Sequence, residues 1–221
     1  MASHGEILGV ILAGGAASRM GGGDKGLADL GGQPMLAHVI ARFRPQVARL
    51  ILNANGDARR FETFDLEVIA DAETGPSDFA GTTAGGRGPL AGIVAALDWV
   101  ARNNAAYAAI ATVSTDVPFL PLDCVARLVQ GRAERLERAV IAESGGQRHP
   151  TIGLWPFTLA ESLRAALIRG DLSLNRFATA HDAIAVSFPF SESGGRSIDP
   201  FFNANTPEDL RAARAWLAGK P

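Results

Sequence analysis

A glycine-rich loop with two basic side chains is the segment of this sequence best suited to chemistry on phosphates. It occupies residues 12–25, directly after an apolar run. Because glycine has no Cβ, the backbone amides of such a loop can turn toward an anion and hold phosphate oxygens. The residues of the loop that we expect to contact phosphate are Gly14, Gly15, Arg19 and Lys25.

Two known phosphate-binding motifs do not describe this loop. Gly26 follows Lys25 where a P-loop needs Ser or Thr, and the glycine spacing differs from that of the dinucleotide fingerprint. A glycine-rich loop alone also occurs as an ordinary turn, but the basic pair makes anion binding the more specific interpretation. Lys25 is unusual in this chain, because only Lys25 and Lys220 among the 21 basic residues are lysines.

A carboxylate farther along the chain is the candidate ligand for a divalent cation. Asp116 follows an apolar run at 107–113 and precedes Pro118, so its side chain should project from the end of a strand. Mg²⁺ prefers few protein carboxylates together with phosphate oxygens and water, so one Asp suffices. Asn205 is the expected second ligand on the metal side, with Asn203 as its substitute. An Asp that caps a turn and an Asn that forms one are the alternatives.

Two polar residues end the second and third expected strands. Asn53 and Asp71 should therefore lie above the sheet edge beside the glycine-rich loop, where an amide and a carboxylate can bind a ribose or the donor edge of a purine. Plain turn residues at strand ends are the alternative. Backbone amides at Pro89 or Leu90 could reach a base, although a proline at the start of a helix needs no ligand to explain it.

These residues must be positioned by alternating strands and helices. Short apolar runs predict strands, and apolar residues three and four apart predict helices. The expected strands are 7–12, 50–52, 68–70, 107–113, 139–142, 151–154 and 183–188. The expected helices are 35–43, 89–102, 122–136, 157–169, 172–180 and one that begins at 206–209. The stretch 72–88 is expected to be a loop, and 144–149 a turn-like segment. The pattern predicts an α/β protein, a three-layer α/β/α sandwich whose mostly parallel, Rossmann-like sheet binds ligands beyond the carboxyl ends of its strands.

Composition excludes several classes of protein. The chain has 221 residues, which favours one domain over 1–221. The formal net charge of −2 gives no bulk attraction for nucleic acid. Cys124 is the only cysteine, so neither an intrachain disulfide nor a zinc site built on cysteines within one chain is possible. No apolar run has the length of a membrane span, and the run at 7–17 has no basic residue before it, so we expect a cytoplasmic protein that does not bind membranes.

Several segments together resemble one family. The loop 12–25 resembles the signature of the nucleotidyltransferases that activate sugars and cofactors. Its form here resembles that of the molybdenum cofactor guanylyltransferases, together with segments 53–55, 88–92, 115–118, 148–151 and 203–207. The resemblance extends from residue 7 to about 217, and the departure from it is a longer stretch at 72–87. It implies the fold of the nucleotide-diphospho-sugar transferases, with a GTP-binding part at about 1–120 and a molybdopterin-side part at about 121–221.

The resemblance also implies a reaction and a set of roles. GMP would pass from GTP to molybdopterin, giving the guanine dinucleotide cofactor and pyrophosphate, with Mg²⁺ on Asp116. Arg19 would clamp the β- and γ-phosphates. Arg148 and His149 would help to hold molybdopterin, since an arginine fork matches its phosphate. Proteins that handle the molybdenum cofactor and recipient molybdoenzymes are possible partners. The implied GTP-binding residues are Leu12, Ala13, Gly14, Gly15, Lys25, Asn53, Asp71 and Asp116.

Three other functions are compatible with parts of the pattern. A cytidylyltransferase, acting on the same cofactor or on isoprenoid precursors, would use CTP in place of GTP. A non-catalytic module would bind GTP without releasing pyrophosphate. A small dehydrogenase is disfavoured because the fingerprint glycines are missing.

Overall fold

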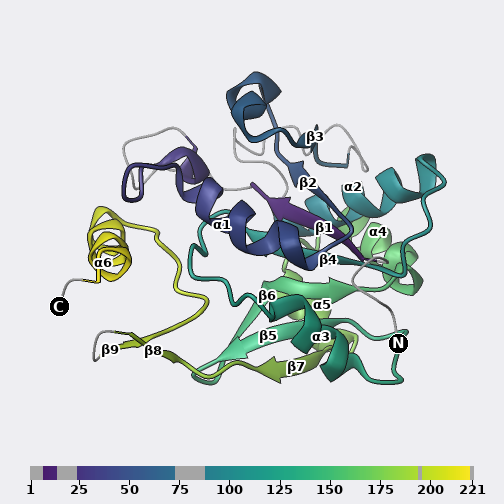
Figure 1. The fold of residues 1–221 in the computed structure, drawn as a ribbon. Helices are drawn as coiled ribbons and strands as arrows, with labels where there is room; N and C mark the ends of the chain where they lie inside the picture. The colour runs from purple at the N-terminus through teal and green to yellow at the C-terminus, as the bar shows by residue number, and fades with distance from the viewer. Residues whose placement is uncertain (1–6, 14–23, 73–87, 194–195, 220–221) are drawn as a thin grey trace.

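The computed structural model describes residues 7–13, 24–72, 88–193 and 196–219 (Figure 1). Three of the residues expected to contact phosphate, Gly14, Gly15 and Arg19, lie outside this part of the chain. So does nearly all of the longer stretch at 72–87.

A seven-stranded sheet forms the centre of the molecule, with the strand order β3-β2-β1-β4-β6-β5-β7. Only β6 among these strands runs antiparallel to its neighbours, so the expectation of a mostly parallel sheet is confirmed. The strands are short and apolar, and all six residues of β1 are buried, as in a parallel sheet covered on both faces. Their bounds are β1 Ile7–Leu12, β2 Arg49–Asn53, β3 Glu67–Ile69, β4 Ala109–Ser114, β5 Val140–Ser144, β6 Gln147–Trp155 and β7 Ile184–Ser187.

Helices cover both faces of the sheet, which confirms the three-layer sandwich (Figure 1). On one face lie α1 (Met35–Phe43) and α3 (Cys124–Arg132). On the other lie α2 (Pro89–Arg102), α4 (Ala160–Arg169) and α5 (Leu174–Ala180). Two separate buried clusters result, one on each side of the sheet.

The last helix, α6 (Pro207–Leu217), stands apart from the two layers, at the left of Figure 1. Its buried Leu210 and Ala213 form a small third cluster with Leu30 and Met35. The helix begins where the sequence predicts, and Thr206 caps it while Asp209 completes a capping box. This third cluster joins the end of the chain to the segment that follows Lys25.

Two local predictions are wrong or incomplete. The expected helix 122–136 ends at Arg132, where Ala133 takes a positive φ of 49°. The segment 144–149 is mostly strand, because Gly145 and Gly146, with φ of 54° and 78°, make the turn by themselves. Arg148 and His149 therefore lie in β6 and not in a loop.

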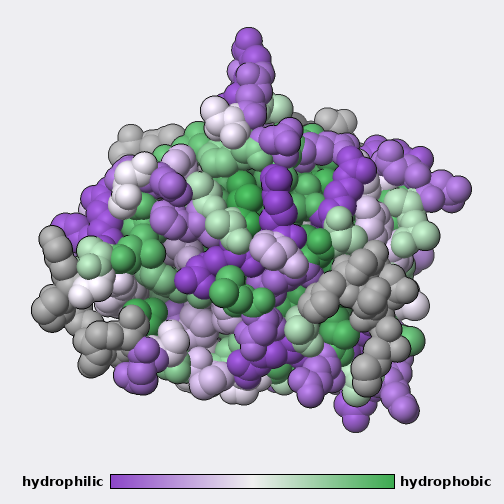
Figure 2. Space-filling model, in the orientation of Figure 1, coloured by the Kyte–Doolittle hydropathy of each residue, from purple (hydrophilic) through white to green (hydrophobic). Residues whose placement is uncertain are grey.

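Several further elements were not expected. They include 3₁₀ helices at Lys25–Leu27, Arg44–Gln46 and Ala58–Phe64 and a small hairpin of β8 (Ser191–Ser193) and β9 (Arg196–Ile198). Within the described residues no helix combines the length and the apolar character needed to cross a membrane. Hydrophilic and hydrophobic residues are interspersed over the face drawn in Figure 2.

Candidate functional site

The carboxyl ends of three neighbouring strands meet at one edge of the sheet. Leu12 of β1 is in register with Asn53 of β2 and with Ser114 of β4. The backbone continues this pairing beyond β1, since the Ala13 amide donates to the carbonyl oxygen of Asn53 at 2.8 Å. The edge at which ligands bind in open α/β sheets therefore carries Leu12, Ala13 and Asn53, and Asp116 follows β4 at the same edge.

Three predicted site residues from distant parts of the chain form one cluster. The ammonium nitrogen Nζ of Lys25 lies 3.5 Å from the carboxylate oxygen Oδ2 of Asp116. It also donates to Oδ1 of Asn205. The side chains of Lys25 and Asp116 are 22% and 17% exposed, so the pair is only partly open to solvent. We call Lys25, Asp116 and Asn205 the cation cluster.

Local backbone geometry holds Lys25 at this place. Asp24 caps the 3₁₀ helix Lys25–Leu27 through a bond of 3.1 Å from the Gly26 amide to its Oδ1. A Cβ at Gly26 would lie only 3.2 Å from Cβ of Thr115, so glycine lets this turn approach the chain beside Asp116 closely. The turn that carries Lys25 is thus packed against the end of β4.

Asn205 is held by the capping box of α6. Asp209 Oδ2 accepts the backbone amides of Asn205 and Thr206, each at 2.9 Å. The Ala204 amide donates to the carbonyl oxygen of Asp116 at 3.1 Å. The segment that leads into α6 is therefore hydrogen-bonded to the backbone of Asp116. The turn-forming alternative for Asn205 accounts for its backbone bonds but not for its side-chain contact with Lys25.

The cation cluster contains oxygen ligands of the kind that a hard divalent cation needs. A carboxylate oxygen and an amide oxygen suit Mg²⁺, which keeps several waters and takes phosphate oxygens from its substrate. Within the described residues no group of three or more His, Cys, Asp or Glu could form a metal site of protein ligands alone. The arrangement fits a cation shared with a phosphate ligand.

Asn53 and Asp71 are also brought together, as expected. The Asn53 amide Nδ2 donates to Asp71 Oδ1 at 3.1 Å and to the carbonyl oxygen of Ile69 at 3.3 Å. Asn55 reaches the same carboxylate, donating from Nδ2 to Asp71 Oδ2 at 2.7 Å. Asn55 was not among the residues chosen from the sequence, although the segment 53–55 that contains it was. Both oxygens of Asp71 are thus oriented by asparagine amides.

Gly92 in α2 makes room for Asn53. A Cβ on Gly92 would overlap Oδ1 of Asn53 and would lie 2.8 Å from Cδ2 of Leu12. The helix that begins at Pro89 therefore packs directly against two residues of the sheet edge. The structure supports the role of Pro89 as the first residue of α2 and leaves the proposed contact of this helix start with a base as a prediction.

His149 is buried and bonded to the protein. Its Nε2 lies 2.8 Å from Ser144 Oγ, which donates to Asp199 Oδ1 at 2.8 Å, and the same carboxylate oxygen accepts the Phe201 amide. Because the Ser144 hydroxyl donates its proton to Asp199, it must accept the hydrogen bond from His149. The imidazole of His149 is therefore protonated at Nε2. Burial lowers the pKa of His149, and the charges of Asp199 and Glu143 oppose this in part. His149 thus supports the segment that leads to Asn205.

Arg148 is exposed and points away from its neighbour. Successive residues of a strand face opposite sides of the sheet, so Arg148 and His149 are not side by side. Arg148 lines a surface pocket of about 390 Å³ with Arg135, Arg138 and Asp182. No described residue of the cation cluster bonds to Arg148.

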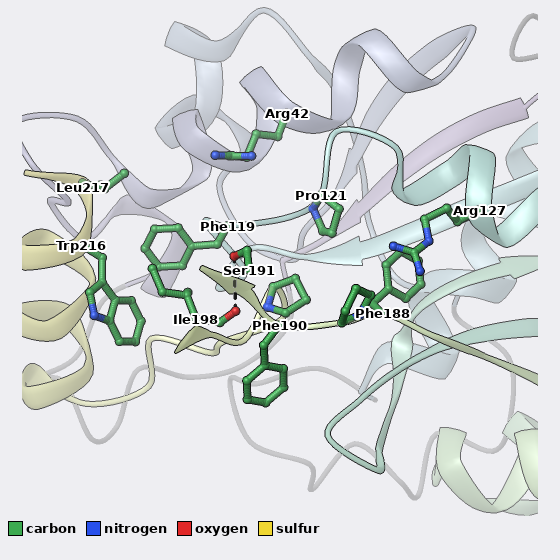
Figure 3. A pocket seen from close by; sticks show the side chains of 12 residues that line it. Arg42, Phe119, Pro121, Arg127, Phe188, Phe190, Ser191, Ile198, Trp216 and Leu217 are labelled. Carbon is green, nitrogen blue, oxygen red and sulfur yellow. Dashed lines mark hydrogen bonds between the residues drawn. The ribbon is translucent and has the colours of Figure 1, made fainter. Parts of the chain in front are cut away.

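A second surface pocket, of about 540 Å³, contains none of the predicted site residues (Figure 3). Arg42 and Arg127 border it, and Arg127 lies over the ring of Phe188 at 4.3 Å. Phe119 and Trp216 form part of its wall and pack edge to face with each other. No residue of the cation cluster lines this pocket.

Comparison with known proteins places this geometry in a family. The model of the MobA-like NTP transferase domain matches residues 9–184. A molybdenum cofactor guanylyltransferase of Nitrobacter hamburgensis is 48% identical over 211 residues, which are 95% of this chain and 94% of the relative. One of Bradyrhizobium sp. is 46% identical over 213 residues, 96% of this chain and 93% of the relative.

A solved structure shares the fold. The molybdopterin-guanine dinucleotide biosynthesis protein A of Archaeoglobus fulgidus has a TM-score of 0.67 and 21% identity, covering 96% of this chain and 98% of its own. The chain is a nucleotidyltransferase and belongs to the family of MobA-like NTP transferases, among the molybdenum cofactor guanylyltransferases.

Proposed function

We propose that this protein transfers GMP from GTP to molybdopterin, with the cation cluster as the centre of the reaction. The observation that carries the proposal is the contact of Lys25 with Asp116 and Asn205 at the carboxyl edge of the sheet. The names of its relatives support GTP and molybdopterin as the two substrates.

The reaction needs alignment and neutralisation of charge more than a nucleophilic side chain. The terminal phosphate of molybdopterin attacks the α-phosphorus of GTP in line, a new phosphorus–oxygen bond forms, and the bond to the β-phosphate breaks to release pyrophosphate. The attacking phosphate is already ionised near neutral pH, so no general base is required. Lys25 balances the charge of the two anionic reactants and holds the triphosphate.

Asp116 and Asn205 would hold the divalent cation, which we propose to be Mg²⁺. When bound, the cation neutralises charge on the phosphates and helps to align them. The clamp of Arg19 on the β- and γ-phosphates and the binding of GTP by Gly14 and Gly15 remain predictions from the sequence. Leu12, the last residue of β1, and Ala13, which follows it, are the other proposed GTP-binding residues of this segment.

Asn53 and Asp71 form the proposed nucleoside site. The Asp71 carboxylate accepts from donors, so it suits either the ribose hydroxyls or the ring N–H and amino group of guanine. The fixed orientation of its two oxygens supports a role in selecting the nucleotide.

The second substrate and the remaining partners are proposed on less direct grounds. Arg148 has an exposed guanidinium that suits the phosphate of molybdopterin. His149 acts on this side of the site through its bond to Ser144. The 1–120 and 121–221 parts of one domain would serve GTP and molybdopterin respectively. A cytoplasmic location, where GTP is available, and delivery to recipient molybdoenzymes complete the proposal.

Pyrophosphate release with each of the four nucleoside triphosphates tests the proposed function. The assay is run with and without molybdopterin and at several concentrations of Mg²⁺. The proposal predicts release only with GTP, molybdopterin and a divalent cation together. Release with CTP would identify a cytidylyltransferase, and GTP binding without release would identify a non-catalytic module.

A further inference from the structure

Arg60 connects two parts of the nucleotide site that are distant in sequence. It belongs to the 3₁₀ helix Ala58–Phe64, which the sequence did not predict. Its guanidinium donates hydrogen bonds to three different residues. Nε bonds to Asp24 Oδ2 at 3.2 Å, Nη2 to the carbonyl oxygen of Asn55 at 2.5 Å, and Nη1 to the carbonyl oxygen of Asp57 at 2.7 Å.

The first of these contacts reaches the turn that carries Lys25. Asp24 uses one carboxylate oxygen for the Gly26 amide and the other for Arg60. The side chains of Arg60 and Asp24 are 30% and 16% exposed, so water screens this ion pair only in part. The carboxylate that shapes the Lys25 turn is therefore itself held by Arg60.

The second contact reaches the nucleoside side. Arg60 fixes the backbone of Asn55, and the Asn55 side chain makes a pair of bonds with Asp71. Nδ2 donates to Asp71 Oδ2 at 2.7 Å, and Oδ1 accepts the Asp71 amide at 2.9 Å. The orientation of the Asp71 carboxylate thus depends on a residue that Arg60 holds.

We propose that Arg60 is a positioning residue that sets Asp71 relative to Lys25. Its guanidinium is the link between the phosphate-side turn and the nucleoside-side carboxylate, and it touches neither substrate. The inference rests on the proposed nucleoside role of Asp71. A nucleotide spans both sides, so an error in their separation weakens binding and also weakens discrimination between nucleosides.

Arg60 also has contacts that serve only the fold. It lies over the ring of Phe61 at 4.4 Å and bonds to the backbone of Asp57. If these were its whole role, its loss would weaken the binding of every nucleotide equally. A positioning role and a purely structural role of Arg60 would both lower the affinity for any one nucleotide. Only the positioning role would change the ratio of the affinities for two different nucleotides.

Calorimetric titration with GTP, ITP and 2′-deoxy-GTP, in the presence of Mg²⁺, measures this ratio without requiring turnover. ITP lacks the 2-amino group of guanine, and the deoxynucleotide lacks a ribose hydroxyl. Asp71→Asn first shows which of the two groups Asp71 selects. Arg60→Ala should reduce the same affinity ratio, by about three- to tenfold, as expected for residues in one hydrogen-bonded network.

Arg59→Ala is the matched control. Arg59 neighbours Arg60 in the same 3₁₀ helix, but its side chain is 80% exposed and its guanidinium bonds only to Asp57 within the described residues. It should leave every affinity and ratio as in the original protein. Asp24→Asn is the second test, because it removes the ion pair while an amide oxygen can still accept the Gly26 amide. It should reduce the ratio in the same direction.

Three results would overturn the proposal. One is an unchanged ratio in Arg60→Ala or, if that variant does not fold, in Asp24→Asn. Another is an equal loss of affinity for all three nucleotides. The third is an Asp71→Asn variant that discriminates as the original protein does. Failure of the proposed function is separate, since it shows as absent pyrophosphate release by a protein that still binds nucleotide.

Discussion

Lys25 and Asp116 are 91 residues apart in sequence, yet Nζ of the one lies 3.5 Å from Oδ2 of the other. The reason is the strand order. Lys25 follows β1 and Asp116 follows β4, and these two strands are parallel neighbours in the centre of the sheet. A cation and a carboxylate placed after such strands meet at their carboxyl edge.

The carboxylate of Asp116 should control the response to the divalent cation. Asp116→Asn removes a negative charge that a hard cation needs, so we expect kcat to fall by about 10²–10³ and the Mg²⁺ concentration for half-maximal rate to rise. Asp123→Asn is the control, since Asp123 is exposed and caps nothing with its side chain. Initial rates at a series of Mg²⁺ concentrations measure both effects. If the initial rates of the two variants depended on Mg²⁺ concentration in the same way, Asp116 would not be a ligand of the metal.

A methyl group at Gly92 should disturb nucleotide binding through Asn53. Gly92→Ala places a Cβ against the Asn53 amide and the Leu12 side chain. Gly131→Ala is an overpacked control in α3, where the new Cβ would meet Val186 instead. Both should lower the free energy of unfolding, by about 1–3 kcal/mol. Only Gly92→Ala should raise the KM for GTP, and an equal KM in both variants would contradict the role of Asn53.

The capping box of α6 should affect catalysis as well as stability. Asp209→Ala frees the amides of Asn205 and Thr206, so the unfolding free energy should fall by about 1 kcal/mol. Because Asn205 then no longer faces Lys25 in a fixed way, kcat should fall by about tenfold. Glu208→Ala is the neighbouring control, in which only an exposed pair with Arg211 is lost. A variant of Asp209 that loses stability but keeps the kcat of the control would show that Asn205 needs no such support.

Burial of His149 should make stability depend on pH. Its pKa lies below the ordinary value of about 6.5 in the folded protein, so below pH 6.5 the unfolded chain binds a proton that the folded protein does not. The stability that the protein gains by keeping His149 neutral is fully present above pH 6.5. It is lost progressively as the pH falls from that value toward the lowered pKa of His149 in the folded protein. Urea unfolding at pH 7.5 and pH 5.5 should show a smaller pH-dependent loss for His149→Gln than for the original protein. Identical losses would assign the pH dependence to other groups.

Much of the fold could be predicted because strong local signals coincide with its elements. The apolar run Ile7–Leu12 is β1, and Pro89 begins α2 as its first residue. Thr206 and Asp209 mark the start of α6 through a capping box, which needs only adjacent residues. In each case a few neighbouring side chains decide the local backbone.

The missed elements lack such signals. The hairpin of β8 and β9 is short and polar, so no alternation of apolar residues marks it. The strand β6 begins with the polar residues Gln147 and Arg148, which favoured a turn in the sequence. Polar residues are tolerated there because the start of β6 is exposed and the two glycines alone make the turn.

The positions of the candidate site residues could be predicted where a residue follows a strand. They could not be predicted where the position depends on bonds between segments that are distant in sequence. Asn53, Asp71 and Asp116 lie at or just after strand ends, and the strand order brings them to one edge. Arg60 was missed because its importance comes from bonds to Asp24 and Asn55, which no spacing in the sequence reveals.

Single-turnover transfer of labelled GMP from GTP to molybdopterin tests the central claim most directly, with Lys25→Ala, Asp116→Asn and the double variant measured beside the original protein. We predict that each single variant is slower by about 10²–10³, and that the double variant is little slower than either, because the two groups act on the same charge. A Lys25→Ala variant that retains most of the rate of the original protein would contradict the account.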